Sequence, residues 1–587
     1  MPPTKITDPE DTPDDTFAFA LSQAEVLLRA GQAAEALKLY QSCLAQQPGN
    51  SDAQYYGGIS ALYTGDIQTA IDLLQAAFKS LPDRADIVNN LGAAYRQLGQ
   101  TKQATEAFQQ AIALDPECAD AIYNLGDALR DDGQIEGAMD AYKQVVKIDP
   151  NYVDAYINLG AIFAAIQMFP EAIQTFEHAI TIQPDVAEAH NNLGTVNQRT
   201  GNIPTAIKNF RQAITLNPDY ADAHYNLGMA LILTEDFTAA TAAFGKTIEL
   251  MPEHVEAHAC QGATLKELKQ YERAIDAFRR ALSLRPLHAA ALRGLGDTYL
   301  KHGDLQEAEA TYRLALKEDQ DNVELLDSLG DVLQKQEHYD DAADMYDRVL
   351  KIDPNNPTAT HFAAALRGKN TEAPPTGYVR DLFNDFASKF EETLLSELSY
   401  NVPELICQSL QRLQGENIIA LPFNRALDLG CGTGLGGKAL KKPGSHFANE
   451  LHGVDISSEM IAEAEKKQLY DSLQIAENVA YLEQSDDREP FNFICAADVF
   501  VYVGSLEATF AAAHSRLAPS GAFAFSIETL AEGTYALHRT GRYAHHGEYI
   551  KTLATTTGFS VQHCQEIVVR QEGGVPIAGL LFVLIRE

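Results

Sequence analysis

The sequence has few cysteines and little basic charge, and both shortages exclude classes of protein. Its seven cysteines are scattered and never stand as a Cys-x-x-Cys pair, so we expect neither a disulfide framework nor a zinc site, and a reducing cytoplasm fits. Lysine and arginine number 45 against 81 aspartate and glutamate residues, a formal net charge of −36. So acidic a chain lacks the basic patches that bind nucleic-acid phosphates or anionic membrane surfaces. We therefore expect no nucleic acid, membrane or metal among its partners.

Long apolar runs are missing too. No stretch reaches the roughly 18 apolar residues that a membrane-spanning helix needs. Residues 1–16 are polar and acidic, contain four prolines and lack the apolar core of a signal peptide. We expect them to form a disordered tail and the folded chain to begin at Phe17.

A repeat of 34 residues fills the first part of the chain. Glycines recur at this spacing without an insertion or deletion, at Gly58, Gly92, Gly126, Gly160, Gly194, Gly228, Gly262, Gly296 and Gly330. Twelve positions after each glycine stands an alanine, and four positions further on a large apolar residue, as in Ala104 and Phe108. A proline closes most units, as Pro116 does. We count ten units over residues 17–356, the first with Ala24 in place of its glycine.

Each recurring position has a physical task. The small glycine and alanine let two helices cross closely, the large apolar residue fills the gap to the next helix pair, and the proline ends the second helix. The pattern resembles the tetratricopeptide (TPR) repeat. This resemblance implies an all-α solenoid, a right-handed superhelix of helix pairs with a long concave face, and we expect residues 357–368 to form its capping helix.

Five consecutive units carry asparagine at the same position: Asn90, Asn124, Asn158, Asn192 and Asn226. The TPR resemblance places this position on the concave face, where one amide per unit would form a ladder. An amide both donates and accepts hydrogen bonds, so a ladder matches a peptide backbone. The superhelix of O-linked N-acetylglucosamine transferase looks similar in this respect and holds extended peptides. We expect a protein or peptide partner in the groove; the alternative is that asparagine is simply common at this position of the repeat.

A second domain is expected after a short linker. Residues 369–377 are polar and rich in proline and glycine, which is typical of a domain boundary. Residues 378–414 have the apolar spacing of a helix. Its aromatic stripe, which includes Phe383, Phe386 and Phe390, is either core or a lid over a site.

Beyond the linker, strands and helices alternate. A buried strand is expected at residues 426–429. Further strands are expected at residues 450–456, 472–476, 491–501, 521–527, 559–570 and 575–585, and helices at 457–467, 506–517 and 547–556. The alternation predicts a doubly wound α/β domain with a parallel sheet. Its last two strands must pair antiparallel, because only a short turn joins them.

Five glycines follow the first strand, and such a turn lets a ligand approach the backbone closely. Gly432, Gly434 and Gly437 match the dinucleotide pattern G-x-G-x-x-G, with Asp455 about 20 residues further on. Asp428 stands directly ahead of the turn, however, and a carboxylate there would repel a pyrophosphate. It would not repel the sulfonium and amino group of S-adenosylmethionine (SAM). We therefore favour SAM over a nicotinamide or flavin cofactor.

Asp-Leu-Gly-Cys-Gly-Thr-Gly and the later Asp-Ile-Ser-Ser-Glu-Met resemble the motifs of class I SAM-dependent methyltransferases. With the repeats, the chain resembles bacterial TPR-containing predicted methyltransferases. The resemblance implies a seven-stranded domain over residues 378–587. It also implies a cofactor site made of Asp428, Gly430, Cys431, Gly432 and Gly434 around the amino-acid part of SAM, Asp455 on the ribose, Ile456 and Met460 on adenine, and Glu477 on the adenine amine. The alternatives are plain core for the two apolar residues and a solvated helix start for Glu477.

Candidate catalytic residues lie where the strands end. Asp498 and Tyr502 follow the fourth strand, at the edge where open α/β sheets bind ligands. Tyr543 and His545 belong to the segment 539–546, the densest group of hydrogen-bonding side chains in the domain. A histidine there could deprotonate an acceptor, whereas the alternative for the segment is a helix cap and surface loop.

The leading hypothesis is a SAM-dependent methyltransferase that acts on a protein or peptide held by the TPR groove. One alternative keeps the enzyme but gives it a small-molecule acceptor, with the repeats as a docking module. Another is a TPR scaffold whose second domain only senses SAM or is inert, which the intact Asp428 and Asp455 disfavour.

Overall fold

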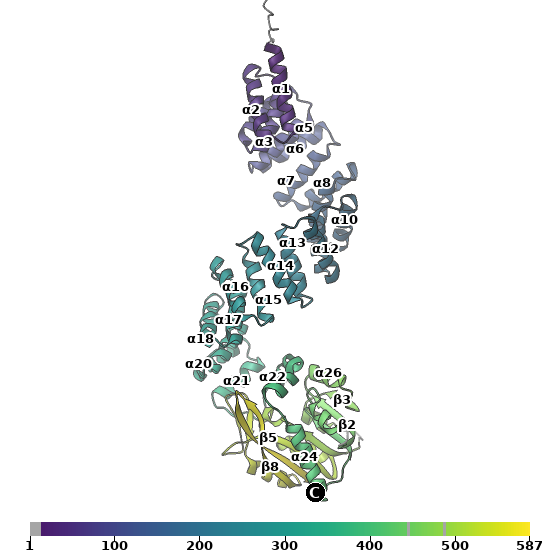
Figure 1. Ribbon diagram of the computed structural model, residues 1–587, viewed down its shortest axis with the longest axis vertical. Helices are drawn as coiled ribbons and strands as arrows, with labels where there is room; N and C mark the ends of the chain where they lie inside the picture. Colours follow the sequence, from purple (N-terminus) through teal and green to yellow (C-terminus); the bar gives the residue numbers. More distant parts are fainter. Residues whose placement is uncertain (1–12, 443–445, 485–488) are drawn as a thin grey trace, which may run out of the picture. The chain divides into compact units, whose positions relative to one another are not determined.

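The computed structural model describes residues 13–442, 446–484 and 489–587. The chain divides into two compact units, Met1–Leu284 and Arg285–Glu587. The colours of Figure 1 follow the chain through both.

The first unit consists of paired antiparallel helices. They are α1 (Pro13–Arg29), α2 (Ala33–Gln46), α3 (Ser51–Thr64), α4 (Ile67–Ser80), α5 (Ala85–Gln97), α6 (Thr101–Leu114), α7 (Ala119–Asp131), α8 (Ile135–Ile148), α9 (Val153–Ala165), α10 (Phe169–Ile182), α11 (Ala187–Arg199), α12 (Ile203–Leu216), α13 (Ala221–Ile232), α14 (Phe237–Leu250), α15 (Val255–Glu267) and α16 (Tyr271–Leu284). The first helix begins at Pro13 and not at the expected Phe17, so it takes up the end of the expected tail. Residues 1–12 of that tail lie outside the described residues.

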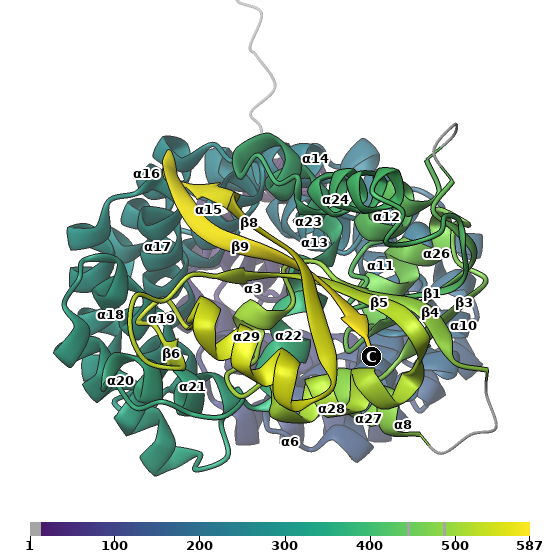
Figure 2. The same ribbon diagram turned by 90° about the horizontal axis from the view of Figure 1, so that it is seen from below.

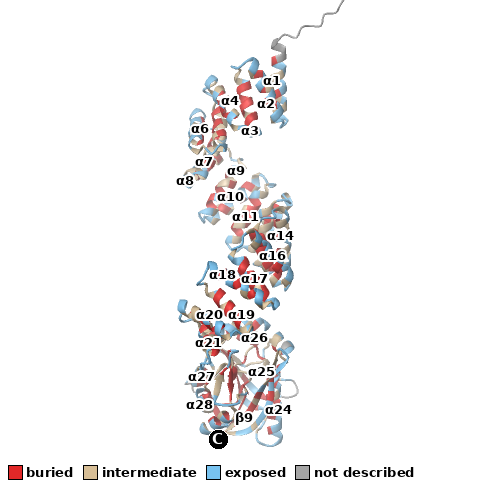
Figure 3. Ribbon diagram, turned by 90° about the vertical axis from the view of Figure 1, so that its left-hand side faces the viewer, coloured by how far each residue is buried: buried red, intermediate tan, exposed pale blue. Residues whose placement is uncertain are grey.

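The contact between the repeated glycine and the repeated aromatic explains the period. A Cβ atom on Gly92 would lie 2.6 Å from the ring of Phe108, and one on Gly228 would lie 2.6 Å from the ring of Phe244. Both rings are fully buried. The glycine is therefore the site against which the aromatic ring of the second helix packs, and Figure 3 shows the buried residues along the facing sides of the helices.

The second unit begins with the last repeats, so its boundary falls earlier than the expected linker. Its first helices are α17 (Ala289–His302), α18 (Leu305–Glu318), α19 (Val323–Lys335), α20 (Tyr339–Ile352) and the capping helix α21 (Pro357–Leu366). The expected linker, 369–377, is bound to the sheet domain. Asn370 bonds the carbonyl oxygen of Tyr535 at 3.0 Å and the N–H of Leu537 at 2.8 Å, and the carbonyl oxygen of Glu372 accepts from the N–H of Gly504 at 3.0 Å.

The expected single helix over residues 378–414 is broken. It consists of α22 (Thr376–Phe386), the short turns η1 (Ala387–Lys389), α23 (Phe390–Glu392) and η2 (Thr393–Glu397), and α24 (Val402–Gly415). Ser399 takes a positive φ of 50°, which a right-handed helix excludes. Pro403 stands in the first turn of α24, where a proline starts a helix but cannot continue one. Helical periodicity continues across the break although the two helices face different surroundings: the apolar residues of α22 line a cavity, and those of α24 pack against the sheet.

A seven-stranded sheet forms the rest of the unit. Its strands are β1 (Phe423–Leu429), β2 (Ala448–Asp455), β3 (Ser472–Ile475), β4 (Phe491–Ala496), β5 (Leu517–Glu528), β8 (Phe559–Glu572) and β9 (Val575–Arg586), in the order β3-β2-β1-β4-β5-β9-β8. Only β9 runs antiparallel, to both β5 and β8, as the short turn predicts. The helices that complete the domain are α25 (Leu435–Leu440), α26 (Ser458–Lys466), α27 (Asn478–Glu483), α28 (Glu507–Arg516) and α29 (Gly547–Thr556).

Apolar cores lie on both faces of the sheet. One buried cluster joins the sheet to α28 and α29, and another joins it to α24; Figure 2 shows these helices on opposite sides of the strands. Chain order reverses between β1 and β4, which are neighbours in the sheet. Ligands of such sheets bind at this switch point, beyond the carboxyl ends of the strands.

Two local expectations need correction near that edge. The fourth strand ends at Ala496 and not at residue 501, because Asp498 takes a left-handed backbone conformation and η3 (Phe500–Tyr502) follows. The segment after β5, for which no strand was expected, forms a two-stranded hairpin of β6 (Tyr535–Leu537) and β7 (Tyr543–His545).

Candidate active site

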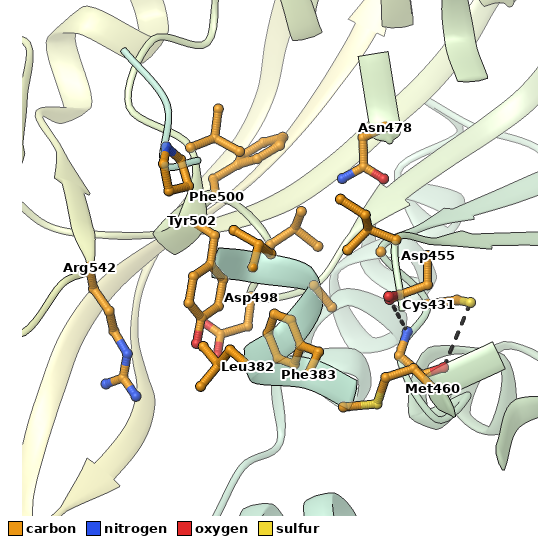
Figure 4. Close-up of a pocket in the computed structure, with 18 of the residues that line it drawn as sticks. Leu382, Phe383, Cys431, Asp455, Met460, Asn478, Asp498, Phe500, Tyr502 and Arg542 are labelled. Carbon is orange, nitrogen blue, oxygen red and sulfur yellow. Dashed lines mark hydrogen bonds between the residues drawn. The ribbon is translucent and has the colours of Figure 1, made fainter. Parts of the chain in front are cut away.

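A cavity of about 880 Å³ lies at the switch point of the sheet. Its lining comes from the glycine turn, the ends of β2 and β4, and α22. In Figure 4, Asp455 and Cys431 lie at one end and Tyr502, Asp498 and Arg542 at the other. The volume lies within the range of about 300–1,000 Å³ typical of small-molecule sites.

The glycine turn keeps side chains out of the first end. Gly430 and Gly432 line the cavity with positive φ values of 70° and 52°. A Cβ atom on Gly430 would lie 2.7 Å from Val499 Cγ2. Gly434, with φ of 92°, does not line the cavity but packs against Tyr470. The structure therefore places Gly434 next to the cavity lining and not in it.

Two buried carboxylates flank this turn. Asp428 is 2% exposed, its Oδ2 accepts from the hydroxyl of Tyr470 at 2.7 Å, and Cys495 Sγ lies 3.4 Å from its Oδ1. Asp455 is 8% exposed and accepts the N–H of Gly432 and that of Ser457, each at 2.9 Å. Burial raises the pKa of both carboxyls, although these hydrogen bonds lower it. A ligand that brings hydroxyl donors or positive charge would stabilise them further.

The far wall of this end is apolar with two polar groups. Ile456 and the fully buried Met460 line it. Glu477 also lines it but is exposed, and its Oε2 caps α27 by accepting the N–H of Ala480 at 2.7 Å. Asn478 was missed in the sequence, and Figure 4 shows its amide directed into the cavity. The sequence signal that could have identified Asn478 was its position after the third strand, next to Glu477.

The other end is built around Asp498. Its φ is 58°, and its N–H donates to Ser526 Oγ at 2.9 Å. Both carboxylate oxygens lie 3.3 Å from a guanidinium nitrogen of Arg570, which is 2% exposed and also pairs with Glu528 and Glu572. Burial raises the pKa of Asp498 to about 6, while Arg570 lowers it. Burial and the Arg570 guanidinium therefore act on this carboxyl in opposite directions.

Aromatic side chains close the cavity between its ends. Phe383, Phe386 and Phe390 all line it. The ring of Phe383 meets that of Tyr502 at 5.1 Å and 78°. These three side chains line the cavity, and Phe390 also packs against the core around α24.

Two expected catalytic residues lie outside the cavity. His545 is fully buried, and its Nε2 lies 2.9 Å from the carbonyl oxygen of Gly504. Burial lowers the pKa of His545 to about 4. Tyr543 is also fully buried, and its hydroxyl bonds Thr371 Oγ1. The prediction that these two act on an acceptor is wrong, because neither lines the cavity and both hold the β6–β7 hairpin in place.

The asparagine ladder is partly engaged in ties between repeats. Four of its amides donate to the side chain 35 positions earlier, in the preceding repeat. The pairs are Asn90 with Tyr55 (3.3 Å), Asn124 with Asn89 (2.9 Å), Asn158 with Tyr123 (2.8 Å) and Asn226 with Asn191 (3.0 Å). Asn192 instead accepts from Asn191 at 3.5 Å. At the other four positions, a peptide would have to use the amide oxygen and the amide N–H that is not already bonded.

Two structural features are absent from the described ranges. None of the helices there is long and apolar enough to cross a lipid bilayer. Nowhere in the same ranges do three or more His, Cys, Asp or Glu side chains gather as metal ligands would.

Models of known protein families match both the repeats and the sheet domain of the chain. Models of the tetratricopeptide repeat match residues 21–77, 55–104, 92–129, 126–167, 153–186, 199–234, 221–254, 261–323 and 323–356. A model described as a methyltransferase domain matches residues 398–564. The chain is a TPR protein with a methyltransferase domain. The TPR solenoid and the class I methyltransferase fold expected from the sequence are thereby confirmed.

Solved structures match the repeats of this TPR methyltransferase. MamA is 31% identical and matches over 28% of this chain and 95% of its own, with a TM-score of 0.27. YrrB, described as a TPR protein with an unusual peptide-binding site, is 26% identical over 32% of this chain and 97% of its own (TM-score 0.29). Pseudomonas aeruginosa PilF is 19% identical over 36% and 96% (TM-score 0.34). No protein of curated function matches the chain.

Proposed function

We propose that this protein transfers the methyl group of SAM to a protein or peptide that its TPR repeats recruit. The observation that carries the choice of SAM is the pair of buried carboxylates, Asp428 and Asp455, around a glycine turn in which Gly430 has no room for a side chain. In a methyltransferase domain, two buried carboxylates suit SAM, because its amino group and ribose hydroxyls can donate hydrogen bonds to them. The seven free cysteines support a place in a reducing cytoplasm.

Different residues around the turn would bind different parts of the cofactor. Asp428 and the backbone of Gly430 and Gly432 would hold its amino-acid part, and Asp455 would accept from the ribose hydroxyls. Ile456 and Met460 would cover adenine, with Glu477 and Asn478 at its amine. When bound, SAM supplies a methyl group on a cationic sulfonium, which is already a good leaving group.

The chain's own residues would then align the acceptor and take its proton. Asp498, whose pKa is raised to about 6, would accept a proton from the acceptor, and Arg570 would hold the carboxylate in place. The aromatic wall of α22 would keep water out. Alignment of this kind lowers a barrier by roughly 7–11 kcal/mol.

A small-molecule acceptor is the second candidate, with the repeats as a docking module. The volume of the cavity and its aromatic wall favour it, because both suit a compact apolar acceptor beside the cofactor. A SAM-sensing or inert domain is disfavoured by the retained carboxylates and by Asp498.

Titration of SAM into the full-length protein tests the cofactor. We expect binding by calorimetry, and a loss of about tenfold to a hundredfold in affinity for Asp455→Asn, because charge-assisted hydrogen bonds to a buried carboxylate would be lost. Glu459→Gln is the matched control, since this exposed carboxylate lies on the neighbouring helix α26 and does not line the cavity. Absence of SAM binding by the wild type would overturn the proposal.

A further inference from the structure

The loop between β6 and β7 forms part of the acceptor end of the cavity. It contributes Thr540 and Arg542 to the lining. The loop is tightly bent: the N–H of His538 donates to the carbonyl oxygen of Arg542 at 2.8 Å, and the N–H of Gly541 donates back to that of His538 at 2.9 Å. Gly541 has a φ of +78°. The loop therefore sets the backbone position of Arg542, while its guanidinium pairs with Glu572 of β8.

The last repeats hold the outer side of the same loop. The side-chain amide of Gln334, on α19, donates to the carbonyl oxygen of Arg539 at 2.8 Å. The Arg539 guanidinium lies 4.4 Å from the ring centroid of Tyr339, on α20, which is a cation–π contact. Both contacts come from helices of the repeat fold and reach the loop at Arg539, which does not line the cavity.

His361 of the capping helix α21 makes the most buried of these contacts. It is 2% exposed, and its Nε2 lies 2.8 Å from the carbonyl oxygen of Gly541. Burial lowers the pKa of His361, so the ring is neutral at pH 7 and Nε2–H donates to that carbonyl. A Cβ atom on Gly541 would lie 3.0 Å from the ring of Phe362, so the loop fits closely against α21. A buried hydrogen bond of this kind specifies one arrangement of the loop, because its loss leaves an unpaired polar group.

A second route leads from His361 to the cavity wall. Its ring stacks on that of Tyr378 with centroids 4.4 Å apart, and Tyr378 lines the cavity. The imidazole thus contacts both the loop that presents Arg542 and the first turn of α22, which carries the aromatic wall.

We propose that His361 is a positioning residue for the methyl acceptor, acting through the Gly541 carbonyl and the Tyr378 ring to place Arg542 and Thr540 at the acceptor end. This inference rests on the proposed function. It makes the last repeats, α19 to α21, a structural part of the methyltransferase and not only an arm that recruits its partner.

The test compares full-length variants. His361→Phe keeps an aromatic ring but removes the donor, and His361→Gln restores an N–H. Gln334→Ala removes the hydrogen bond of a half-buried side chain to the Arg539 carbonyl oxygen. His258→Phe is the matched control: this buried histidine makes the same kind of bond, at 3.0 Å to the carbonyl oxygen of Pro252, in a repeat outside both the ladder and the loop contacts. Three quantities are measured for each: the SAM affinity, the hydrogen exchange of the 538 and 541 amides, and the initial rate of label transfer from tritiated SAM to a cell extract.

We expect His361→Phe to speed exchange of these amides and slow label transfer, each at least about tenfold, with SAM affinity unchanged within about twofold. His361→Gln recovers most of the rate, Gln334→Ala shows a smaller effect of the same kind, and His258→Phe matches the wild type. The inference is overturned if loop exchange or transfer by both His361→Phe and Gln334→Ala equals that of the wild type. It is also overturned if their SAM affinity falls in parallel. A wild type that neither binds SAM nor transfers label instead contradicts the proposed function, and the exchange data then still decide whether His361 holds the loop.

Discussion

Asp498 combines a left-handed backbone, a largely buried carboxylate and an arginine partner. Its side chain is 17% exposed and faces Arg570, which three carboxylates share. Strained backbone conformations of this kind cost of order 1–3 kcal/mol and persist where the surroundings over-determine them, often at functional sites. The strain here follows from the end of β4, where the chain must turn away from the sheet edge that the cavity occupies.

The pH dependence of methyl transfer tests the role of Asp498. Because burial raises its pKa to about 6, the carboxylate form that accepts a proton is lost as the pH falls through about 6. We expect the initial rate of label transfer at saturating SAM to fall below that pH. We expect Asp498→Asn to lower the rate at pH 7.5 by about 10²–10⁴-fold and to remove this limb of the profile.

The control for that experiment is Asp381→Asn, on α22. This carboxylate is more than half exposed and pairs with Arg380 outside the cavity lining. Its profile should match that of the wild type. An Asp498→Asn enzyme that keeps both rate and profile would show that no proton is transferred to this residue.

At the scale of elements, glycines decide how closely segments approach. In the turn after β1, a Cβ atom on Gly436 would collide with the carboxylate of Asp428. In the repeats, the glycine of each first helix accommodates the aromatic of the second. In both places the missing side chain of a glycine makes room for a neighbour: the Asp428 carboxylate in the first case and the repeat aromatic in the second.

Gly228→Ala tests this packing in α13. The added Cβ would lie 2.6 Å from the buried ring of Phe244. We expect a net loss of about 1–2 kcal/mol, because overpacking costs about 1–3 kcal/mol and alanine returns part of it through helix propensity. The measurement is the midpoint of urea unfolding followed by far-UV circular dichroism.

Gly49→Ala serves as its control, because a Cβ atom at this turn position meets nothing within 4 Å. Its midpoint should stay close to that of the wild type. Equal midpoints for both variants would contradict the packing account of the 34-residue period.

At the scale of the whole molecule, a methyltransferase domain and a set of repeats share one chain. Four of the five asparagine amides tie their repeat to the one before, and apart from that of Asn192 the amide oxygens accept no hydrogen bond from the described part of the chain. The ladder therefore keeps acceptor capacity for a peptide backbone.

Replacement of Asn124, Asn158 and Asn192 by alanine tests recruitment. We expect label transfer from tritiated SAM to protein in a cell extract to fall at least about tenfold, since several backbone hydrogen bonds of roughly 1 kcal/mol each would be lost. The SAM affinity should stay unchanged, because the cofactor residues lie in the other unit.

Asn209→Ala is the control for the ladder, because the amide of Asn209 donates within its own helix, to the Thr205 carbonyl oxygen at 3.0 Å. Label that appears only in the small-molecule fraction, for the wild type as well, would replace the peptide acceptor by the second candidate.

The sequence by itself determined the repeat period, the alternation of strands and helices, the antiparallel last pair and most of the residues around the glycine turn, where we propose that SAM binds. These features depend on residues close together in the chain: a glycine sixteen positions before its aromatic partner, or a carboxylate two positions before a glycine turn. Local periodicity and turn chemistry report them directly.

Only the tertiary structure decided which residues lie at the other end of the cavity, where we propose that the acceptor binds. It placed His545 in the core, paired Asp498 with Arg570 across 72 positions, and joined His361 to Gly541 across 180. The segment 539–546 contains histidines, arginines and a tyrosine, and its composition alone does not show which face the cavity. The physical reason is that the direction of each side chain follows from the β6–β7 hairpin and from the repeats that hold it, and no local pattern encodes contacts between segments so far apart.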